Sequence, residues 1–295
     1  MVRLGRLVRF SVTPFLDQDD PGSNSYASKP SGEGLALFLE LAIELVGPAA
    51  PQTGLLVNVS NIDKIARRLA VPIFAEHIHQ HFRRGEHVSL AALARILQLV
   101  HERLAGQFPG AQVDRLCLKL NPFRTLTMDA KEPGMIYLSE KFEFAATHKL
   151  WNDSFSERQN RDIFGKCANA SGHGHNYVVE VAIAAPAPRL SPPARATSGE
   201  SKSEPPAVAI GRFQSVVDSE LIQLLDHRNL NVDVPAFRET TPTVENIALF
   251  AWGRLAGKFD PAKLHSVTVW ESDRTYCSYY GPAEGETALL QNGDR

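Results

Sequence analysis

Two histidines one residue apart, His173 and His175, follow Cys167 closely and precede an apolar run. Side chains alternate faces along an extended chain, so both imidazoles would lie on one side of a strand, close enough to share a metal ion. A third histidine, His148, ends an upstream stretch with the same alternation. Because three neutral imidazoles with one open position are typical of a catalytic zinc site, the pattern predicts zinc bound by these histidines.

Cys167 is the candidate base of such a site. A thiolate close to a dication, with Lys166 beside it, would have a lowered pKa and could remove a proton. Taken singly, a strand histidine is more often a packed residue than a ligand, and a free cysteine is usually a small buried hydrophobe. A purely structural zinc site is a less favoured interpretation, because it would need a fourth ligand and Cys117 and Cys277 fall in unrelated strands.

Five stretches in the same order resemble the 6-pyruvoyltetrahydropterin synthase family, over residues 136–281. They are 142–148, 164–181 with its cysteine, five residues and His-Gly-His-Asn-Tyr, then 225–230, 242–247 and 267–281. The resemblance implies a zinc-dependent lyase that converts 7,8-dihydroneopterin triphosphate to 6-pyruvoyltetrahydropterin and triphosphate. The five residues between Cys167 and His173 favour this activity over 6-carboxytetrahydropterin synthase, the queuosine-pathway branch that uses the same substrate. A non-catalytic pterin-binding or assembly module is a third alternative.

The resemblance also implies roles outside the zinc site. Asp226 and His227 would be catalytic, as an acid–base pair in which the carboxylate orients the imidazole. Glu271 would be catalytic too and would anchor the pterin ring through its two oxygens. Thr243 and Glu245 would contact the pterin, although an N-cap of a helix explains Thr243 equally well.

Composition narrows the class of protein and its partners. The 295 residues are 43% hydrophobic and 22% charged, with a net charge of −2, so neither nucleic acid nor a membrane surface is an expected partner. Three scattered cysteines fit a reducing compartment, and no apolar run is long enough to span a bilayer. We therefore expect a cytoplasmic protein, and the resemblance implies a small-molecule partner, a pterin triphosphate.

The expected elements occur in a similar order in each half of the chain. The first half predicts strands at 8–15, 34–46 and 55–59, a helix from Asn61 toward Arg84, a helix at 89–104, and strands at 113–120 and 124–128. The second half predicts strands at 138–149, 174–185, 207–214 and 265–281, with helices at 215–225 and 243–257. With the resemblance, this order implies an α+β fold of two tandem tunnelling-fold modules, each an antiparallel four-stranded sheet with two helices on one face.

The two modules are expected to differ in chemistry. Residues 135–285 would form the catalytic module, interrupted by a disordered insertion at 186–206, whereas residues 1–130 would be a degenerate, structural copy. His77 and His81 in the first module could bridge a metal, but a solvated helix surface explains them better. Because the family assembles as hexamers of a single module, the resemblance implies a homo-oligomer, a trimer of tandem chains.

Overall fold

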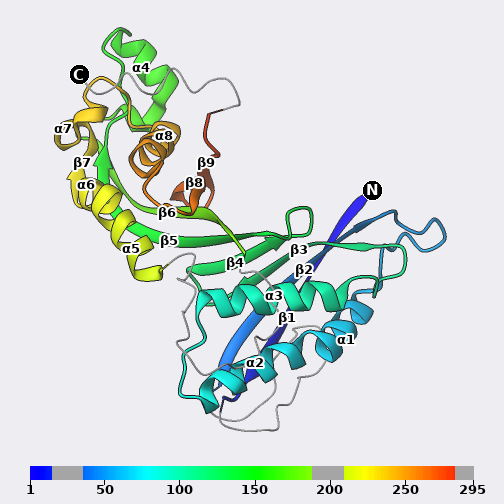
Figure 1. The fold of residues 1–295 in the computed structure, drawn as a ribbon. Helices are drawn as coiled ribbons and strands as arrows, with labels where there is room; N and C mark the ends of the chain where they lie inside the picture. The colour runs from blue at the N-terminus through cyan, green and yellow to red at the C-terminus, as the bar shows by residue number, and fades with distance from the viewer. Residues whose placement is uncertain (15–35, 188–208, 283–295) are drawn as a thin grey trace. The chain divides into compact units, whose positions relative to one another are not determined.

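The computed structural model describes residues 1–14, 36–187 and 209–282 (Figure 1). The chain divides into two compact units, one formed by residues 1–138 and 185–207 and the other by residues 139–184 and 208–295. Residues 17–33, whose Asp, Gly, Ser, Asn and Pro content predicts an irregular loop, and nearly all of the insertion expected at 186–206 lie outside the described residues.

The first unit is built on four strands that neighbour one another in chain order and pair antiparallel. They are β1 (Val2–Val12), β2 (Leu37–Gly47), β3 (Gln112–Lys119) and β4 (Arg124–Asp129). Alternation sets which face is buried: along β2, Leu41, Ile43 and Leu45 are buried while the residues between them are half-buried. One face of this sheet therefore forms the core of the unit.

Three helices pack on this sheet, α1 (Val59–Leu69), α2 (Val71–Arg83) and α3 (Leu90–Leu104) (Figure 1). The strand predicted at 55–59 is wrong, because the Asn58 side chain accepts a hydrogen bond from the Ser60 amide and starts α1. The single helix predicted from Asn61 toward Arg84 is also wrong. It breaks at Ala70, since Pro72 has no N–H to continue the helical ladder.

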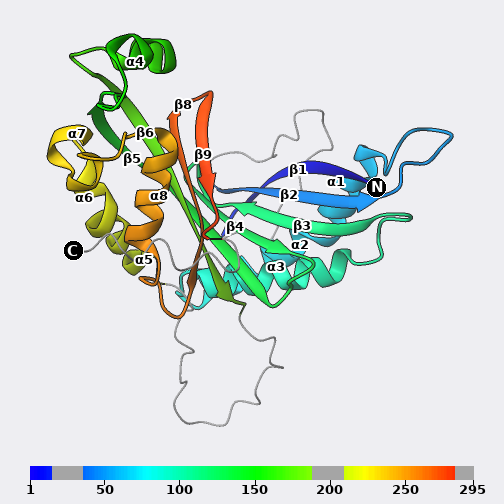
Figure 2. The same cartoon turned by 90° about the horizontal axis from the view of Figure 1, so that it is seen from above.

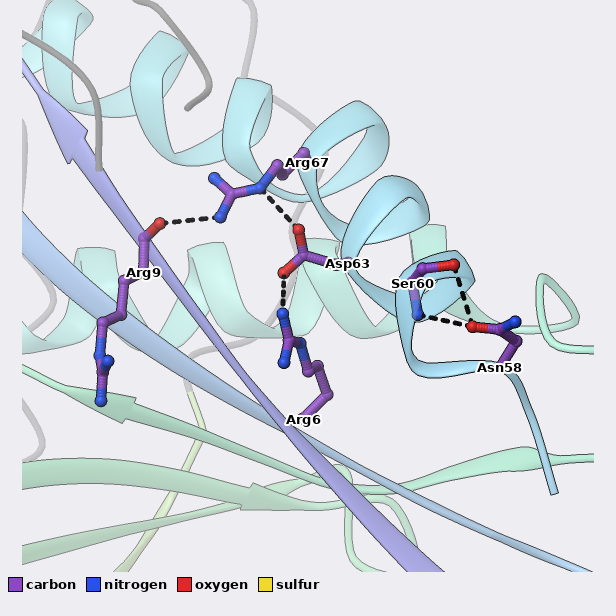
Figure 3. A network of polar contacts seen from close by, with 6 residues as sticks. All are labelled: Arg6, Arg9, Asn58, Ser60, Asp63 and Arg67. Atoms are coloured by element: carbon purple, nitrogen blue, oxygen red, sulfur yellow. Dashed lines mark hydrogen bonds and ion pairs between the residues drawn. The ribbon is translucent and has the colours of Figure 1, made fainter. Parts of the chain in front are cut away.

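A buried carboxylate joins α1 to β1 in this unit (Figure 3). Asp63 is 0% exposed, and its two oxygens lie 2.9 Å from Arg67 Nε and 3.3 Å from Arg6 Nη2. Arg67 also donates to the Arg9 carbonyl oxygen at 3.2 Å. A buried charge is costly unless it is paired and hydrogen-bonded, and here both carboxylate oxygens face a guanidinium.

The second unit also has four strands that neighbour one another, β5 (Met135–His148), β6 (His173–Pro186), β8 (Lys263–Ser272) and β9 (Thr275–Tyr279). The last three pair antiparallel, and the strand predicted at 265–281 is therefore two strands. A short strand, β7 (Arg228–Asn229), runs parallel to the end of β5 and pairs with Ala146 and Thr147.

The helices of the second unit differ from the sequence prediction at two places. The main segments are α5 (Ile210–Val217), continuing through η2 (Asp218–Ile222) into α6 (Gln223–Leu225), and α8 (Val244–Leu255), which packs on β8 and β9; Figure 2 shows α8 alongside α5 and α6. The strand predicted at 207–214 is wrong within the described residues, because Phe213, Val217 and Leu221 are buried at helical spacing. Sequence analysis missed α4 (Glu157–Phe164), which starts at a Ser156–Gln159 capping box.

Shorter turns complete the second unit: η1 (Gly165–Ala168), α7 (Leu230–Asp233) and η3 (Pro235–Phe237). None of the helices in the described ranges has the length and hydropathy of a membrane-spanning segment.

Candidate metal centre

Four side chains of the second unit converge at the ends of β5, β6 and β8. His148, His173, His175 and Glu271 each offer one ligand atom, and these atoms lie within 4.8 Å of one another. The Nε2 atoms of His148 and His173 are 3.1 Å apart, and Glu271 Oε1 is 2.9 Å from His175 Nε2. His148 is buried and the other three are half-buried, so the group is reachable from solvent on one side.

A close approach of two backbone segments makes this convergence possible. Gly172, directly before β6, has a φ of +66°, and a Cβ built on it would lie 2.8 Å from the His148 carbonyl oxygen. Only glycine takes this conformation at low cost and leaves room for the neighbouring backbone. The turn that leads into His173 and His175 therefore packs directly against the end of β5.

Hydrogen bonding fixes the tautomer of His148. Its Nδ1 lies 2.8 Å from the Pro242 carbonyl oxygen, which can only accept, so Nδ1 carries the proton and Nε2 presents a lone pair to the group. The fully buried Tyr177 also contacts the His148 ring. Its hydroxyl is 3.4 Å from the same Nδ1, and its own ring stacks on Phe144 with the ring centroids 4.9 Å apart. Outer contacts of this kind orient metal-binding imidazoles.

The electrostatics of the group fit a bound cation. Burial lowers the pKa of His148 and of His175, although the Glu271 carboxylate acts in the opposite direction, so both imidazoles favour the neutral form that binds metals. His173 Nδ1 and His175 Nε2 are buried, and neither has a hydrogen-bond partner among the described residues. His175 Nε2 is close to Glu271 Oε1 but not aligned as a hydrogen bond, and the Nε2 atoms of His148 and His173 face each other at 3.1 Å. A metal ion would satisfy them.

Cys167 lies beside this group in the turn η1. It is half-buried, and its carbonyl oxygen accepts a hydrogen bond from the Leu150 amide at 2.9 Å. In the metal-free protein burial raises the pKa of the Cys167 thiol, and the Glu271 carboxylate raises it further. The lowered pKa expected from the sequence therefore depends on a dication in the group.

The structure brings Asp226 and His227 together but does not place them in the metal group. Asp226 Oδ2 lies 2.8 Å from His227 Nδ1, and hydrogen bonds from the Ala145 amide and from His227 lower the pKa of Asp226. His227 has a φ of +56°, a strained conformation for a residue other than glycine, and its side chain is 82% exposed.

The acid–base pair borders an open cleft of about 470 Å³, in which His227 lies with Thr147, Asn176 and Arg228. Thr147 and Asn176 alternate along their strands with His148 and His175, so their side chains point to the other face of the sheet. Of the four side chains in the metal group, His175 alone also lines this cleft.

The two residues expected to contact the pterin lie at the start of α8. Thr243 is the N-cap of that helix and accepts from the Asn246 amide at 3.3 Å, so its capping role is confirmed. It directly follows Pro242, whose carbonyl holds His148. Glu245, in the first turn, lies outside the metal group, and its charge contributes to the raised pKa of Cys277 on β9, for which burial is the main cause.

Glu271 is the member of the metal group that sequence analysis assigned elsewhere. Its strand carried the signal, because Val267 and Val269 are buried on one face of β8 and Glu271 continues that alternation. The Pro242 carbonyl had no signal in the sequence, since any residue supplies one. His77 and His81 belong to no group of three or more metal-binding side chains in the described ranges, and His81 Nδ1 instead bonds the His77 carbonyl at 2.8 Å.

An α+β fold whose second unit gathers three imidazoles and a carboxylate defines a candidate metalloprotein, and comparison with known proteins gives the family. The family model for 6-pyruvoyl tetrahydropterin synthase matches residues 137–282. The chain belongs to this family, and the match covers its second half.

Two sequence relatives agree with that assignment. The 6-pyruvoyl tetrahydrobiopterin synthase of Homo sapiens is 32% identical over 145 residues, which are 49% of this chain and 90% of the human protein. That of Drosophila melanogaster is 31% identical over 147 residues, 50% of this chain and 80% of the fly protein. The solved structure of Caenorhabditis elegans 6-pyruvoyl tetrahydropterin synthase aligns with a TM-score of 0.42 at 30% identity, covering 50% of this chain and 96% of the worm chain.

Proposed function

We propose that the protein is a zinc-dependent 6-pyruvoyltetrahydropterin synthase that converts 7,8-dihydroneopterin triphosphate to 6-pyruvoyltetrahydropterin and triphosphate. The observation that carries the proposal is the convergence of His148, His173 and His175 in a chain that belongs to this family. Three histidines are a ligand set of catalytic zinc sites. When bound, zinc would supply Lewis-acid polarisation of the hydroxyls on the substrate side chain.

The remaining chemistry falls to side chains around this group. Cys167 would remove a proton from the substrate carbon chain, and the bond that ties its turn to Leu150, two residues after His148, supports this role. Glu271 has one oxygen close to His175, so its other oxygen is available to accept hydrogen bonds from the pterin ring. Thr243 and Glu245, at the start of α8, offer further contacts to that ring.

Asp226 and His227 would complete the site from a second copy of the chain. The pair is exposed, and the residues that line its cleft point mainly to the face opposite the metal group. A proton-transfer pair works best when its surroundings exclude water. In a single chain the exposed pair has no such cover. We therefore propose a homo-oligomer, a trimer of tandem chains, in which the pair of one copy serves the metal group of another.

The first unit would be a degenerate tunnelling-fold module with a structural role. Both units contain four neighbouring strands with helices packed on them, which is the basis for the tandem interpretation. The described residues of the first unit contain no group of metal-binding side chains like that of the second. A cytoplasmic location also stays a prediction from composition.

Product analysis tests the activity directly. The zinc-loaded protein is incubated with 7,8-dihydroneopterin triphosphate, and the products are identified by mass spectrometry. We expect 6-pyruvoyltetrahydropterin and triphosphate. Release of acetaldehyde would instead identify a 6-carboxytetrahydropterin synthase, and an inert zinc-loaded protein that binds the pterin would indicate a non-catalytic module.

Two inactive variants test the roles and the shared site. Cys167→Ala should keep the metal content of the wild type and lose at least about 100-fold in turnover, as expected for a lost general base. His227→Ala should lose activity in the same way. If the two residues serve one site from different copies, unfolding and refolding a mixture of both variants restores part of the activity, whereas mixtures that stay inactive would contradict the shared site.

A further inference from the structure

The segment that follows the acid–base pair runs alongside the end of β5. The His227 amide donates to the Ala145 carbonyl oxygen at 2.6 Å, and Arg228 and Asn229 then pair with Ala146 and Thr147. The next contact is made by a side chain. Asn231 Oδ1 accepts from the Lys149 amide at 2.7 Å, and Asn231 Nδ2 donates to the Lys149 carbonyl oxygen at 3.0 Å.

We call the two hydrogen bonds between the Asn231 side chain and the Lys149 backbone the clasp. They do with one side chain what the backbone of a neighbouring strand would do. A carboxamide has both an acceptor and two donors, so it can bond the N–H and the C=O of one residue at once. His148, the buried member of the metal group, therefore lies between two fixed residues: Thr147, paired with β7, and Lys149, held by Asn231.

Asn231 is itself held firmly in the short turn α7. Its amide donates to Asn229 Oδ1 at 3.1 Å, and the Asn229 amide donates to Asp233 Oδ2 at 2.8 Å. These bonds fix the backbone of the turn, which carries the Asn231 side chain toward Lys149. A preorganised donor and acceptor lose little conformational entropy when they bond.

The residue after Lys149 connects the clasp to Cys167, the candidate base. Leu150, directly after Lys149, donates its amide to the Cys167 carbonyl oxygen at 2.9 Å. Gly172, at the other end of the Cys167 turn, packs against the His148 carbonyl. The backbone of residues 148–150 therefore supports a metal ligand on one side and the Cys167 turn on the other.

We infer that Asn231 is a positioning residue, which sets the end of β5 and through it both His148 and the Cys167 turn. It touches neither the metal group nor the candidate base and acts through the backbone of Lys149 and Leu150. The inference rests on the proposed function only for the catalytic purpose of those two residues. The coupling itself is measurable without any pterin.

Three measurements on Asn231→Ala test the coupling. Amide hydrogen exchange at Lys149 and Leu150 should be at least tenfold faster, because both amides lose a fixed partner geometry. Alkylation of Cys167 by iodoacetamide should be several-fold faster, and zinc, measured by competition with a chelator, should bind about tenfold more weakly, as for other outer contacts of metal ligands. Asn231→Asp keeps the acceptor for the Lys149 amide and loses the donor, so its values should fall between those of the wild type and of Asn231→Ala.

The matched control is Asn58→Ala, which removes an asparagine cap from α1 in the other unit and should leave all three measurements at their wild-type values. If Asn231→Ala exposes only the Lys149 amide and leaves Leu150 exchange, Cys167 alkylation and zinc affinity unchanged, Asn231 is a local structural residue and the inference is wrong. If Asn231→Ala does not fold, the same comparison on Asn231→Asp decides. If the wild-type protein has no turnover but Asn231→Ala still shows these shifts, the proposed function is refuted and the inference stays intact.

Discussion

Each unit contains a cluster of buried polar side chains, and the two clusters differ in what their carboxylates face. In the first unit the Asp63 carboxylate has Arg67 at 2.9 Å and Arg6 at 3.3 Å, so acceptors meet donors. In the second unit His148, His173, His175 and Glu271 each offer one possible ligand atom, and two buried imidazole nitrogens have no hydrogen-bond partner among the described residues. The carboxylate of the first cluster is paired within the protein, whereas the second cluster has the side chains to bind a metal ion.

The difference separates structure from chemistry within one chain. A carboxylate with a guanidinium at each oxygen links α1 to β1 and has no position left for a metal ion. Three imidazoles and a carboxylate whose ligand atoms lie within 4.8 Å of one another are instead a set of potential metal ligands. The comparison therefore predicts that substitutions in the first cluster lower stability without affecting metal binding, and that substitutions in the second do the reverse.

The largest effect is expected in the second cluster. His173→Ala removes one of three imidazole ligands, so metal content should fall below about a tenth of the wild-type value and turnover by at least about 1000-fold. Metal content is measured by elemental analysis and turnover by product formation. Asp63→Asn is the matched control from the first unit and should retain its metal; loss of metal from both variants would erase the distinction between the clusters.

Asp63→Asn should instead lower the free energy of unfolding by about 3 kcal/mol, because it leaves the buried Arg67 guanidinium without its counter-charge. Urea unfolding followed by circular dichroism measures this. Asp162→Asn is the control, since that carboxylate is 70% exposed in its pair with Arg158 and such pairs contribute little. Equal stability of the two variants would show that the Asp63 network does not hold the first unit together.

A smaller change is expected at the turn that brings β6 to β5. Gly172→Ala forces a side chain into a φ of +66° and against the His148 carbonyl oxygen, at a cost of about 2 kcal/mol. Relief of this clash would move the turn that leads into the histidines, so metal affinity should fall together with stability. Gly211→Ala is the control, as a Cβ there meets no atom within 4 Å. Unchanged zinc affinity in Gly172→Ala would show that the close approach does not shape the metal group.

The smallest effect concerns pH. The pKa values of His148 and His175 are lowered from 6.5 by burial, so below pH 6.5 the unfolded chain takes up protons that the folded, metal-free protein resists. Stability should therefore fall as the pH drops through 6.5 and level off below the folded pKa values. Thermal unfolding of the metal-free protein between pH 8 and pH 5 measures this; a midpoint that rises on acidification would contradict the neutral state of these imidazoles.

Local patterns in the sequence were enough to predict the three histidines of the metal group. His173 and His175 share a face because of strand alternation, and His148 joins them because β5 and β6 are neighbours. Thr243 was recognised as a possible helix cap because capping is decided within one turn.

The errors arose where the outcome depended on competition between patterns or on distant contacts. Residues 210–217 carry β-branched side chains typical of strands, yet Phe213 and Val217 are buried at helical spacing, and burial decided the outcome. Residues 55–59 were predicted as a strand, but the Asn58 side chain caps α1, which begins at the next residue. The tautomer of His148 and the clasp on Lys149 depend on residues more than 80 positions away, Pro242 and Asn231, which no local pattern relates to β5.

The most direct test is a crystal structure of the purified protein with diffraction data collected at the zinc absorption edge. We predict one anomalous peak per chain, about 2.0–2.1 Å from a ring nitrogen of each of His148, His173 and His175, and none beside Asp63. A protein without a peak at these three imidazoles after loading with zinc, or with zinc bound elsewhere, would contradict the central claim.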